Sequence, residues 1–476
     1  MTTSVSFESN GGATWAAGPD VLESLRGQLR GELCYPGEPG YEQARQIWNA
    51  MIDKHPAAVI RAAGAADVMR AVELAREHQL ILSIRGGGHH IAGNAVCDGG
   101  LMLDLSPMKS VRIDPSARTA RVEPGVTLAG FDKEAQAFGL ATPLGINSTT
   151  GVAGLALGGG FGWLSRKLGL TVDNLLSADV VLAKGALVHA SAGENDDLFW
   201  AIRGGGGNFG VVTSFEFRLH PVGPEVIAGL IVHPFANAKE LLHGYRRAVA
   251  NAPDDLTCWV VMRKAPPLPF LPQEVHGKEV VVLAMCYLGD PSNAQATLAP
   301  LRALGKPIAD VVGPMPFAAW QQAFDPLLAP GQRNYWKSHD FVELDDGFID
   351  LLVEYVGRLP SPDCEVFIGH LGGAVNRVPA TATAYPHRDI NFVMNVHTRW
   401  GEASQDQACI RWARELFDRA APYATGGVYV NFMPEDEAQR VSRGAYGPNY
   451  ERLSKLKAKY DPDNLFRRNH NIQPAG

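Results

Sequence analysis

The 476-residue chain lacks the features that mark secreted, zinc-binding and membrane-spanning proteins. None of its six cysteines forms a CxxC pair, which argues against a zinc site or a disulfide framework and favours reduced, buried thiols. No stretch approaches the roughly 18 apolar residues that a membrane helix needs. Residues 1–20 have neither a basic start nor an apolar core, so we expect no secretory signal and a cytoplasmic protein.

An excess of charge of one sign is also missing. Lys and Arg number 43 against 50 Asp and Glu, which gives a formal net charge of −7. Because no run of basic residues occurs, we do not expect a nucleic acid as partner. The lack of a long apolar stretch likewise gives no reason to expect a membrane. Hydrophobic residues make up 46% of the chain, enough for packed cores, and the length fits two or three domains.

Glycine, by contrast, is abundant, with 51 residues, or roughly one in nine against a typical value of about 7%. In the first half the glycines gather in three clusters, at residues 85–90, 151–162 and 204–210. Strand and helix patterns alternate around them without a regular βαβ repeat, so this half is expected to be α+β. One strand pattern, Leu80 to Ile84, runs directly into the first cluster.

The composition changes after Pro224, where glycine thins out. Strand patterns (226–232, 257–262, 280–287, 365–370 and 392–396) alternate with helix patterns (238–250, 293–304, 348–358 and 406–420). They predict a second domain with a broad antiparallel sheet that carries helices. The segment from Tyr429 to Pro474 resumes the polar, aromatic character of the first half and is expected to fold back onto it.

The third cluster matches GxGxxG at Gly205–Gly210, the string of the dinucleotide-binding fingerprint. That fingerprint requires a strand before the glycines and a helix after them. Here Asp196 to Arg203 reads as a helix and Val211 to Phe217 as a strand, so the order is reversed. The Rossmann interpretation therefore fails on context, while a helix cap with a close backbone approach to a cofactor fits.

The first cluster, Arg85-Gly-Gly-Gly-His-His90, follows a strand. Three glycines in succession can point their backbone N–H groups into one concave spot, and Arg85 adds positive charge, so an anion site competes with a plain turn. His89 has no His, Asp or Glu at ligand spacing, so the cluster does not predict a metal site. A core histidine is the other alternative for His89.

The remaining cluster is Pro143 to Gly162, with Ser148, Thr149 and Thr150 before a short helix pattern from Val152. Hydroxyl side chains there are expected to cap the helix and offer a second site that suits a phosphate. Two such sites in one domain fit a ligand with two ends, namely a dinucleotide.

Together these segments resemble the berberine bridge enzyme-like flavin oxidases of the vanillyl-alcohol oxidase/PCMH superfamily. Ser83 to Gly93 is similar to the flavin-attachment loop, 151–174 and 205–213 to two further flavin segments, and 429–472 to the closing signature. The resemblance implies an α+β protein with a PCMH-type FAD-binding domain, residues 1–224 and 429–476. It also implies an inserted substrate domain, residues 225–428, built on a large antiparallel sheet covered by helices.

The resemblance further implies FAD attached covalently through His89, at the 8α carbon of the flavin. Asn147 stands where well-known members carry a second-link cysteine, so a single bond is predicted, and with it a less open site that disfavours bulky polysaccharides. The cofactor-binding residues expected are Arg85, Gly86, Gly87, Gly88, His89, His90, Gly93, Gly145, Ser148, Thr149, Thr150, Gly151, Gly154, Gly160, Gly162, Val211, Asn469 and Asn471.

The expected reaction moves a hydride from a small alcohol or amine to flavin N5, with molecular oxygen restoring the flavin and giving hydrogen peroxide. Tyr429 and Asn431 match a family segment beside the flavin, and Thr150 falls where oxygen approaches. Glu365 and His370 lie on opposite faces of one strand, and His370 is the preferred base. Tyr335 and Lys337 are further polar candidates.

Three alternatives stay open at this stage. The first is a flavin-dependent dehydrogenase of a secondary-metabolite or sugar alcohol that does not use oxygen. The second is a nicotinamide-dependent dehydrogenase, and the third is a non-catalytic flavoprotein or a scaffold protein. Neither the substrate nor the oligomeric state follows from the sequence.

Overall fold

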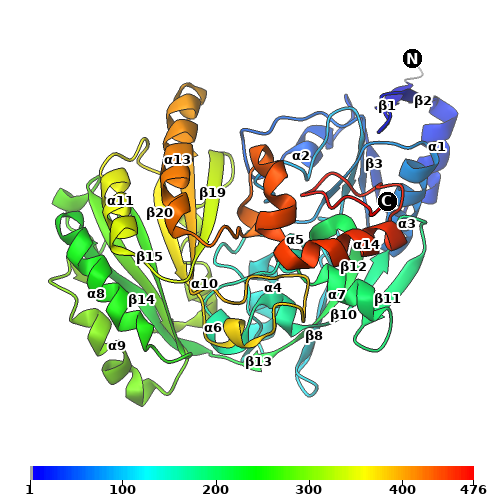
Figure 1. Cartoon of the computed structure of the whole chain (residues 1–476). Coiled ribbons are helices and arrows are strands. Elements are labelled where there is room, and N and C mark those ends of the chain that lie inside the picture. Colours follow the sequence, from blue (N-terminus) through cyan, green and yellow to red (C-terminus); the bar gives the residue numbers. More distant parts are fainter. Residues whose placement is uncertain (1–3) are drawn as a thin grey trace.

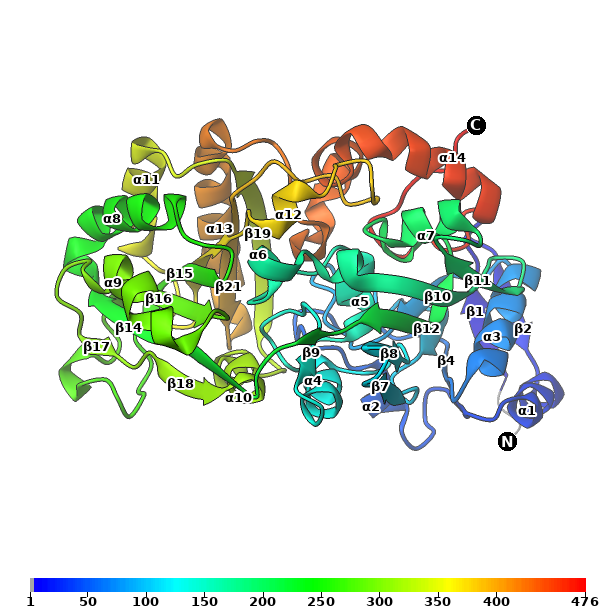
Figure 2. The ribbon, with the colours of Figure 1, turned by 90° about the horizontal axis from the view of Figure 1, so that it is seen from below.

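The computed structural model describes residues 4–476, which form two lobes lying side by side (Figure 1). One lobe contains the N-terminal half of the chain together with its C-terminal end, and the other is built on residues from 225 to about 420. The view from below shows the same division (Figure 2). This arrangement confirms the expected α+β class.

The first lobe begins with a four-stranded sheet in which parallel strands flank β6. Its order is β3 (Glu32–Cys34), β4 (Ala58–Arg61), β6 (Leu101–Asp104) and β5 (Leu82–Arg85). Because β4 and β5 both run parallel to β6, the chain must cross over between them, and α3 (Ala65–Glu77) makes that crossing. The buried side of α3 carries Val68, Ala71 and Val72 at helical spacing.

A five-stranded antiparallel sheet forms the other half of this lobe. Its order is β11 (Leu187–Ser191), β10 (Leu175–Val181), β12 (Val211–Arg218), β8 (Thr119–Val122) and β7 (Val111–Asp114). Around it lie α4 (Leu128–Gln136), α5 (Val152–Leu157), α6 (Ser165–Leu168) and α7 (Asp196–Ile202). Smaller elements are β1 (Val5–Glu8), β2 (Thr14–Ala17), α1 (Pro19–Gln28), α2 (Tyr41–Arg45), β9 (Leu140–Ala141) and β13 (His220–Pro221).

The second lobe is an eight-stranded antiparallel sheet. Its order is β17 (Ala309–Asp310), β14 (Glu225–Pro234), β16 (Glu279–Tyr287), β15 (Leu256–Lys264), β20 (Glu365–His370), β21 (Phe392–Trp400) and β19 (Arg333–Phe341), and β18 (Gly313–Pro316) also pairs with β14. Helices α8 (Ala238–Ala250), α9 (Ala294–Arg302), α11 (Asp346–Val356) and α13 (Asp406–Ala420) cover its outer face, while α10 (Phe317–Gln321) lies near the first lobe.

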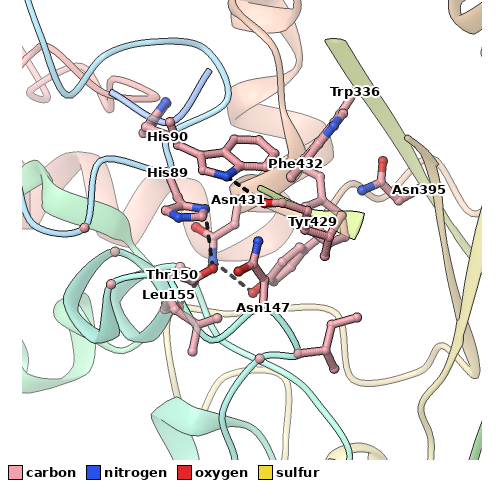
Figure 3. A pocket seen from close by; sticks show the side chains of 18 of the residues that line it. His89, His90, Asn147, Thr150, Leu155, Trp336, Asn395, Tyr429, Asn431 and Phe432 are labelled. Carbon is pink, nitrogen blue, oxygen red and sulfur yellow. Dashed lines mark hydrogen bonds between the residues drawn. The ribbon is translucent and has the colours of Figure 1, made fainter. Parts of the chain in front are cut away.

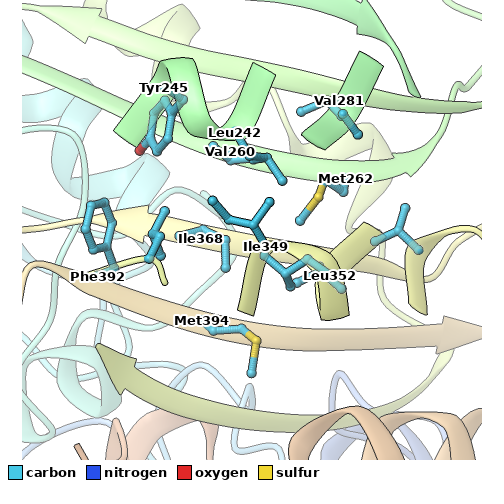
Figure 4. Packing of buried hydrophobic residues seen from close by; sticks show 14 of the residues in the cluster. Leu242, Tyr245, Val260, Met262, Val281, Ile349, Leu352, Ile368, Phe392 and Met394 are labelled. Atoms are coloured by element: carbon cyan, nitrogen blue, oxygen red, sulfur yellow. The ribbon is translucent and has the colours of Figure 1, made fainter. Parts of the chain in front are cut away.

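Alternate residues of the central strands form the core beneath these helices (Figure 4). Val260 and Met262 of β15 and Ile368 of β20 share this core with Leu242 of α8 and Ile349 of α11. Because strand side chains alternate between faces, the intervening residues point to the other side of the sheet, toward the first lobe.

The C-terminal segment packs into the core of the first lobe. Val430, Tyr446 and Leu453, the last of these on α14 (Tyr450–Tyr460), share one hydrophobic cluster with Trp200 of α7 and Phe209. Helix α14 and α7 lie against each other, as Figure 1 shows. The C-terminal segment therefore completes the core of the lobe that the N-terminal half forms.

A buried ion pair anchors this segment. Lys457 and Asp461 are both fully buried, and the ammonium of Lys457 lies 2.6 Å from the Asp461 carboxylate. Lys457 also donates to the carbonyls of Asn208, at 2.8 Å, and Phe466, at 3.0 Å. Asp461 accepts from the backbone N–H groups of Leu465 and Phe466. The pair thus joins α14 to the loop before β12.

Replacing Lys457 with methionine is expected to destabilise the protein strongly. The change leaves the Asp461 carboxylate buried without its cation, which costs about 3–5 kcal/mol in comparable cases. Thermal unfolding followed by circular dichroism measures the effect. The control is Lys455→Met, which removes a solvent-exposed pair with Glu451 and is expected to leave the midpoint unchanged. Equal midpoints for the two variants would contradict the assignment.

One expected helix ends early. The pattern from Tyr41 to Asp53 predicts a helix, but α2 stops at Arg45. Beyond it the chain extends, because Trp48 and Asn49 are bonded to the second lobe: the Trp48 indole donates to the carbonyl of Leu328, at 3.1 Å, and the Asn49 amide to that of Asn334, at 2.9 Å. Long-range bonds override the local helical preference.

Candidate active site

A deep cavity lies between the two lobes, with walls from both (Figure 3). The first lobe contributes its three glycine-rich loops, the C-terminal segment contributes Tyr429 to Phe432 and Arg468 to His470, and the sheet of the second lobe forms the far wall. The glycine clusters, far apart in sequence, therefore come together around one space.

Two glycine loops touch through their backbones. A Cβ at Gly87 would overlap the backbone of Gly151, and one at Gly151 would overlap that of Gly87, so neither position accepts a side chain. Gly154 and Gly207 differ, since a Cβ at either has no protein atom within 4 Å and both residues line the cavity. The first pair holds the loops together, and the second pair leaves room for a bound group.

His89 projects into the cavity from the loop that follows β5 (Figure 3). The indole of Trp48 stacks on its ring, with centroids 4.9 Å apart. The hydroxyl of Thr149 lies 3.0 Å from Nε2, and that of Thr150 lies 3.5 Å from Nδ1. Burial lowers the pKa of His89 to about 3, so the imidazole is neutral and keeps a nucleophilic lone pair.

Asn147 lies on the same wall, close to Thr150. Its amide oxygen accepts from the backbone N–H of Thr149, at 3.1 Å, and from the Thr149 hydroxyl, at 2.8 Å. Asn147 thereby positions the threonine that contacts His89. An amide side chain at this position forms no thioether.

Tyr429 and Asn431 face the cavity from the C-terminal segment (Figure 3). The phenolic oxygen of Tyr429 accepts from the backbone N–H of Gly160, at 3.0 Å, and from the Asn431 amide, at 2.9 Å. Burial raises the pKa of Tyr429 to about 12, so the phenol stays protonated at neutral pH. Tyr429 is therefore a hydrogen-bond donor and not a base.

Several buried polar atoms on the cavity wall have no hydrogen-bond partner within residues 4–476. They include Nδ1 of His90, Oδ1 of Asn469 and Nε2 of His470, with the rings of His90 and His470 5.0 Å apart. Buried polar atoms normally have partners, so these indicate a polar group bound there. A flavin, with its pyrimidine edge and ribityl hydroxyls, supplies both donors and acceptors, and it fits this wall.

The sequence comparisons agree with this geometry. Residues 56–191 match the family described as FAD binding domain, and residues 428–473 match the family described as berberine and berberine like. The chain is 32% identical to (R)-6-hydroxynicotine oxidase of Paenarthrobacter nicotinovorans, over 94% of this chain and 98% of that protein. The chain belongs to the berberine bridge enzyme-like FAD-linked oxidoreductases.

Other relatives extend over nearly the whole chain as well. A chitooligosaccharide oxidase of Gibberella zeae is 29% identical over 96% of this chain and 95% of its own length. The crystal structure of 6-hydroxy-D-nicotine oxidase from Arthrobacter nicotinovorans superimposes with a TM-score of 0.84 at 30% identity, covering 94% of this chain and 98% of that one. The expected family and PCMH-type fold are thus confirmed.

Most of the residues expected to bind the cofactor in this FAD-linked oxidoreductase do line the cavity. The residues are Gly86, Gly87, Gly88, His89, His90, Gly145, Thr150, Gly151, Gly154, Val211 and Asn469. Thr149 does not line the cavity, but its hydroxyl contacts the imidazole of His89. Trp48 and Trp336 also line the cavity and were missed, because an isolated tryptophan carries no sequence signal for such a site.

Arg85 and Ser148 need correction. Arg85 follows Ile84 on β5, and alternation turns its guanidinium away from the cavity to the carbonyl of Ala44, at 2.7 Å. The Ser148 hydroxyl donates to the Asp325 carboxylate and makes no hydrogen bond to α5. Helix α5 begins after Gly151 and has no side-chain cap. The Arg85 guanidinium therefore lies behind the first glycine loop, against Gly88, and not in the cavity. The expected helix cap is absent from α5.

Four further positions also lie off the cavity wall. Gly93 has a φ of +72°, and Gly162 packs against the carbonyl of Leu144, so both serve the backbone. Gly160 acts through its N–H bond to Tyr429, and Asn471 lies just beyond the lining residues. These positions support the loops that line the cavity rather than lining it themselves.

The expected base, His370, does not line the cavity either. His370 lies on the helix-covered face of β20, stacked on Phe392, with Nε2 3.0 Å from the guanidinium of Arg166. Glu365, on the opposite face, lines the cavity, and so does His397 of β21. The predicted opposition of Glu365 and His370 is confirmed, but Glu365 is the one that faces the cavity. Tyr335 and Lys337 also point away, toward Asp436 and Glu437.

Glu365 and His397 are cross-strand neighbours in the register of β20 and β21. One carboxylate oxygen lies 3.1 Å from Nδ1 of His397, and the other accepts from Arg263 at 2.7 Å. Burial disfavours the charge of Glu365, but Arg263 and His397 outweigh it and lower its pKa to about 2. An ionised carboxylate only accepts, so Nδ1 of His397 carries the hydrogen.

The opposite nitrogen of His397 is then a free acceptor. Burial lowers the pKa of His397, which keeps the imidazole neutral, and Nε2 has no partner among the described residues. The ring packs edge-on against Trp336, with centroids 4.4 Å apart. A neutral imidazole oriented by a carboxylate is the arrangement of a general base.

Residues 4–476 lack two features that mark other classes of protein. No helix there is both long and apolar enough to cross a membrane. In the same residues, no group of three or more His, Cys, Asp or Glu side chains lies close enough together to hold a metal ion.

Proposed function

We propose that the protein is an oxidase that carries FAD on a single covalent bond to His89 and oxidises an alcohol or amine with molecular oxygen. The observation that supports this most is the neutral His89, stacked on Trp48 and flanked by two threonine hydroxyls at a cavity with unpaired polar atoms. The protein makes no thioether in this proposal, because Asn147 stands at the second-link position.

The reaction removes two hydrogens from the substrate. FAD held by the glycine loops and His89 would supply a two-electron acceptor there, and molecular oxygen would be the final oxidant. His397 takes the hydroxyl proton at Nε2, while Glu365 holds the imidazole in the required tautomer. Tyr429 accepts from Gly160 and Asn431, so its phenolic hydrogen is left to bond a group in the cavity. Thr150 lines the cavity with its hydroxyl 3.5 Å from Nδ1 of His89.

In this proposal the chain divides into two domains. Residues 1–224 and 429–476 form the FAD-binding domain, and residues 225–428 form the substrate domain. The six cysteines are buried free thiols, which favours a reducing, cytoplasmic location. Helix α7 precedes and β12 follows Gly205–Gly210, the reverse of the nicotinamide-binding order, so that alternative has no support.

Oxygen consumption tests the oxidase assignment. We expect a candidate alcohol to yield hydrogen peroxide and carbonyl product in equal amounts, because oxygen accepts both electrons. Peroxide is measured with a coupled peroxidase, and the product by mass spectrometry. Product formation that requires an artificial electron acceptor, with no peroxide in air, would favour the dehydrogenase alternative instead.

A further inference from the structure

The sheet of the second lobe is apolar on both faces where it borders the cavity. One face packs beneath α8, α11 and α13 (Figure 4). On the other face Val232 of β14, Val261 of β15 and Val282 of β16 line the cavity. An antiparallel sheet usually turns one polar face to water, so a second apolar face requires an apolar cover.

The loop between β15 and β16 provides part of that cover. Leu268 and Phe270 point inward and line the cavity. Pro267, before Leu268, and Pro269, between the two, are exposed. Leu271 joins the same hydrophobic cluster as Val232 and Val282. We call the space enclosed by β14, β15, β16, β20 and residues 265–278 the sheet chamber.

Aromatic rings border the sheet chamber on the side of β20. Trp259 lies against Phe367, with ring centroids 4.9 Å apart, and against Phe161 at 5.9 Å. All three line the cavity. Aromatic side chains present flat faces and edges that pack well against another ring. The walls thus suit a ring system better than a flexible chain.

Polar groups in the sheet chamber are few and gather at one end. Arg263 and Glu365, the charged side chains that line this end, form an ion pair. The nearby guanidinium of Arg399 is held by the carbonyls of Leu327 and Ala329 and does not line the cavity. The unpaired atoms there are Nε2 of His397, Oδ1 of Asn395 and Nε1 of Trp336, all buried. They offer two acceptors and one donor, enough for one hydroxyl group.

We propose that the substrate is a neutral, ring-bearing and largely apolar alcohol, bound with its rings in the sheet chamber and its single reacting hydroxyl at His397. The inference rests on the oxidase proposed above and specifies its substrate class. A saccharide is disfavoured because most of its hydroxyls would face Val, Leu and Phe side chains and lose their hydrogen bonds.

The chemistry balances for an alcohol of this class. The hydroxyl proton moves to Nε2 of His397, and the hydrogen on the hydroxyl-bearing carbon leaves with its electron pair. The substrate becomes a carbonyl compound. Oxygen, the co-reactant of the proposed oxidase, takes the two electrons and both hydrogens to give hydrogen peroxide.

Binding of 2-naphthol to the purified flavoprotein tests the inference. This probe has two fused rings and one hydroxyl but no hydrogen on the hydroxyl-bearing carbon, so it binds without being oxidised. We expect a saturable change in the visible flavin spectrum with 2-naphthol and none with cellobiose at the same concentrations. Saturation by cellobiose without a response to 2-naphthol would overturn the proposal.

Variants in the loop locate the binding site. Leu268→Asp places a charge in the sheet chamber and is expected to weaken 2-naphthol binding at least tenfold, and Phe270→Ser is the second, milder variant. Pro269→Asp adds the same charge at the adjacent exposed position and is expected to bind as the wild type does. Wild-type affinity in both chamber variants would overturn the proposal. A purified protein without flavin would instead contradict the proposed oxidase.

Discussion

Replacing His89 with alanine is expected to release the flavin completely from the acid-precipitated protein. In the wild type the flavin should stay with the pellet, because the bond to the imidazole survives denaturation. Without the imidazole, only non-covalent contacts with the glycine loops hold the cofactor, and acid destroys these. The measurement is flavin absorbance in the pellet and in the supernatant after precipitation with trichloroacetic acid.

Two neighbouring variants serve as controls. His90→Ala changes the adjacent histidine, whose unpaired Nδ1 faces the cavity, and is expected to keep the covalent flavin. Asn147→Ala is expected to keep it as well, because only one bond is proposed. Free FAD in the supernatant of the wild-type protein would contradict the covalent link itself.

The second large effect is expected at His397. Substituting glutamine removes the unpaired Nε2 acceptor and should lower kcat by about 10²–10⁴, the usual contribution of a general base. Steady-state oxygen consumption measures the loss. The matched control is His370→Gln, the same change on the opposite face of the sheet, which leaves the cavity wall intact. A larger loss of kcat in the His370 variant would restore the base expected from sequence.

The pH dependence of activity distinguishes a base from a structural residue, because a purely structural role of His397 would not affect it. His397 accepts a proton only when neutral, so activity should fall as the pH drops through its folded pKa, which burial places below the usual 6.5. Glu365 opposes that lowering, so Glu365→Gln should shift the acid limb of kcat/KM to lower pH while also reducing the rate. An unshifted limb would exclude His397 as the titrating group.

The cofactor side of the cavity was largely predictable from the sequence. Its signals are local: glycines that follow a strand, and a histidine next to them. The sequence prediction placed Arg85 at the cofactor incorrectly. Strand alternation could have corrected it, because Ile84 and Arg85 lie on opposite faces of β5. Ser148 could not be placed, since its partner Asp325 lies 177 residues away in the sequence.

The residues on the substrate side of the cavity could not be predicted from local sequence patterns. Glu365 and His397 face each other because β20 and β21 pair in one particular register. Alternation showed that only one of Glu365 and His370 faces the cavity, but nothing local indicated which one. The choice depends on which face the helices cover, and that is decided by the packing of the whole lobe.

The course of protein synthesis gives a further meaning to the returning C-terminal segment. The cavity wall includes His89 and also Asn469 and His470, which are synthesised about 380 residues later. A growing polypeptide that already contains every glycine loop therefore still lacks one wall of the cavity. A premature stop codon before the final helix leaves the same wall missing.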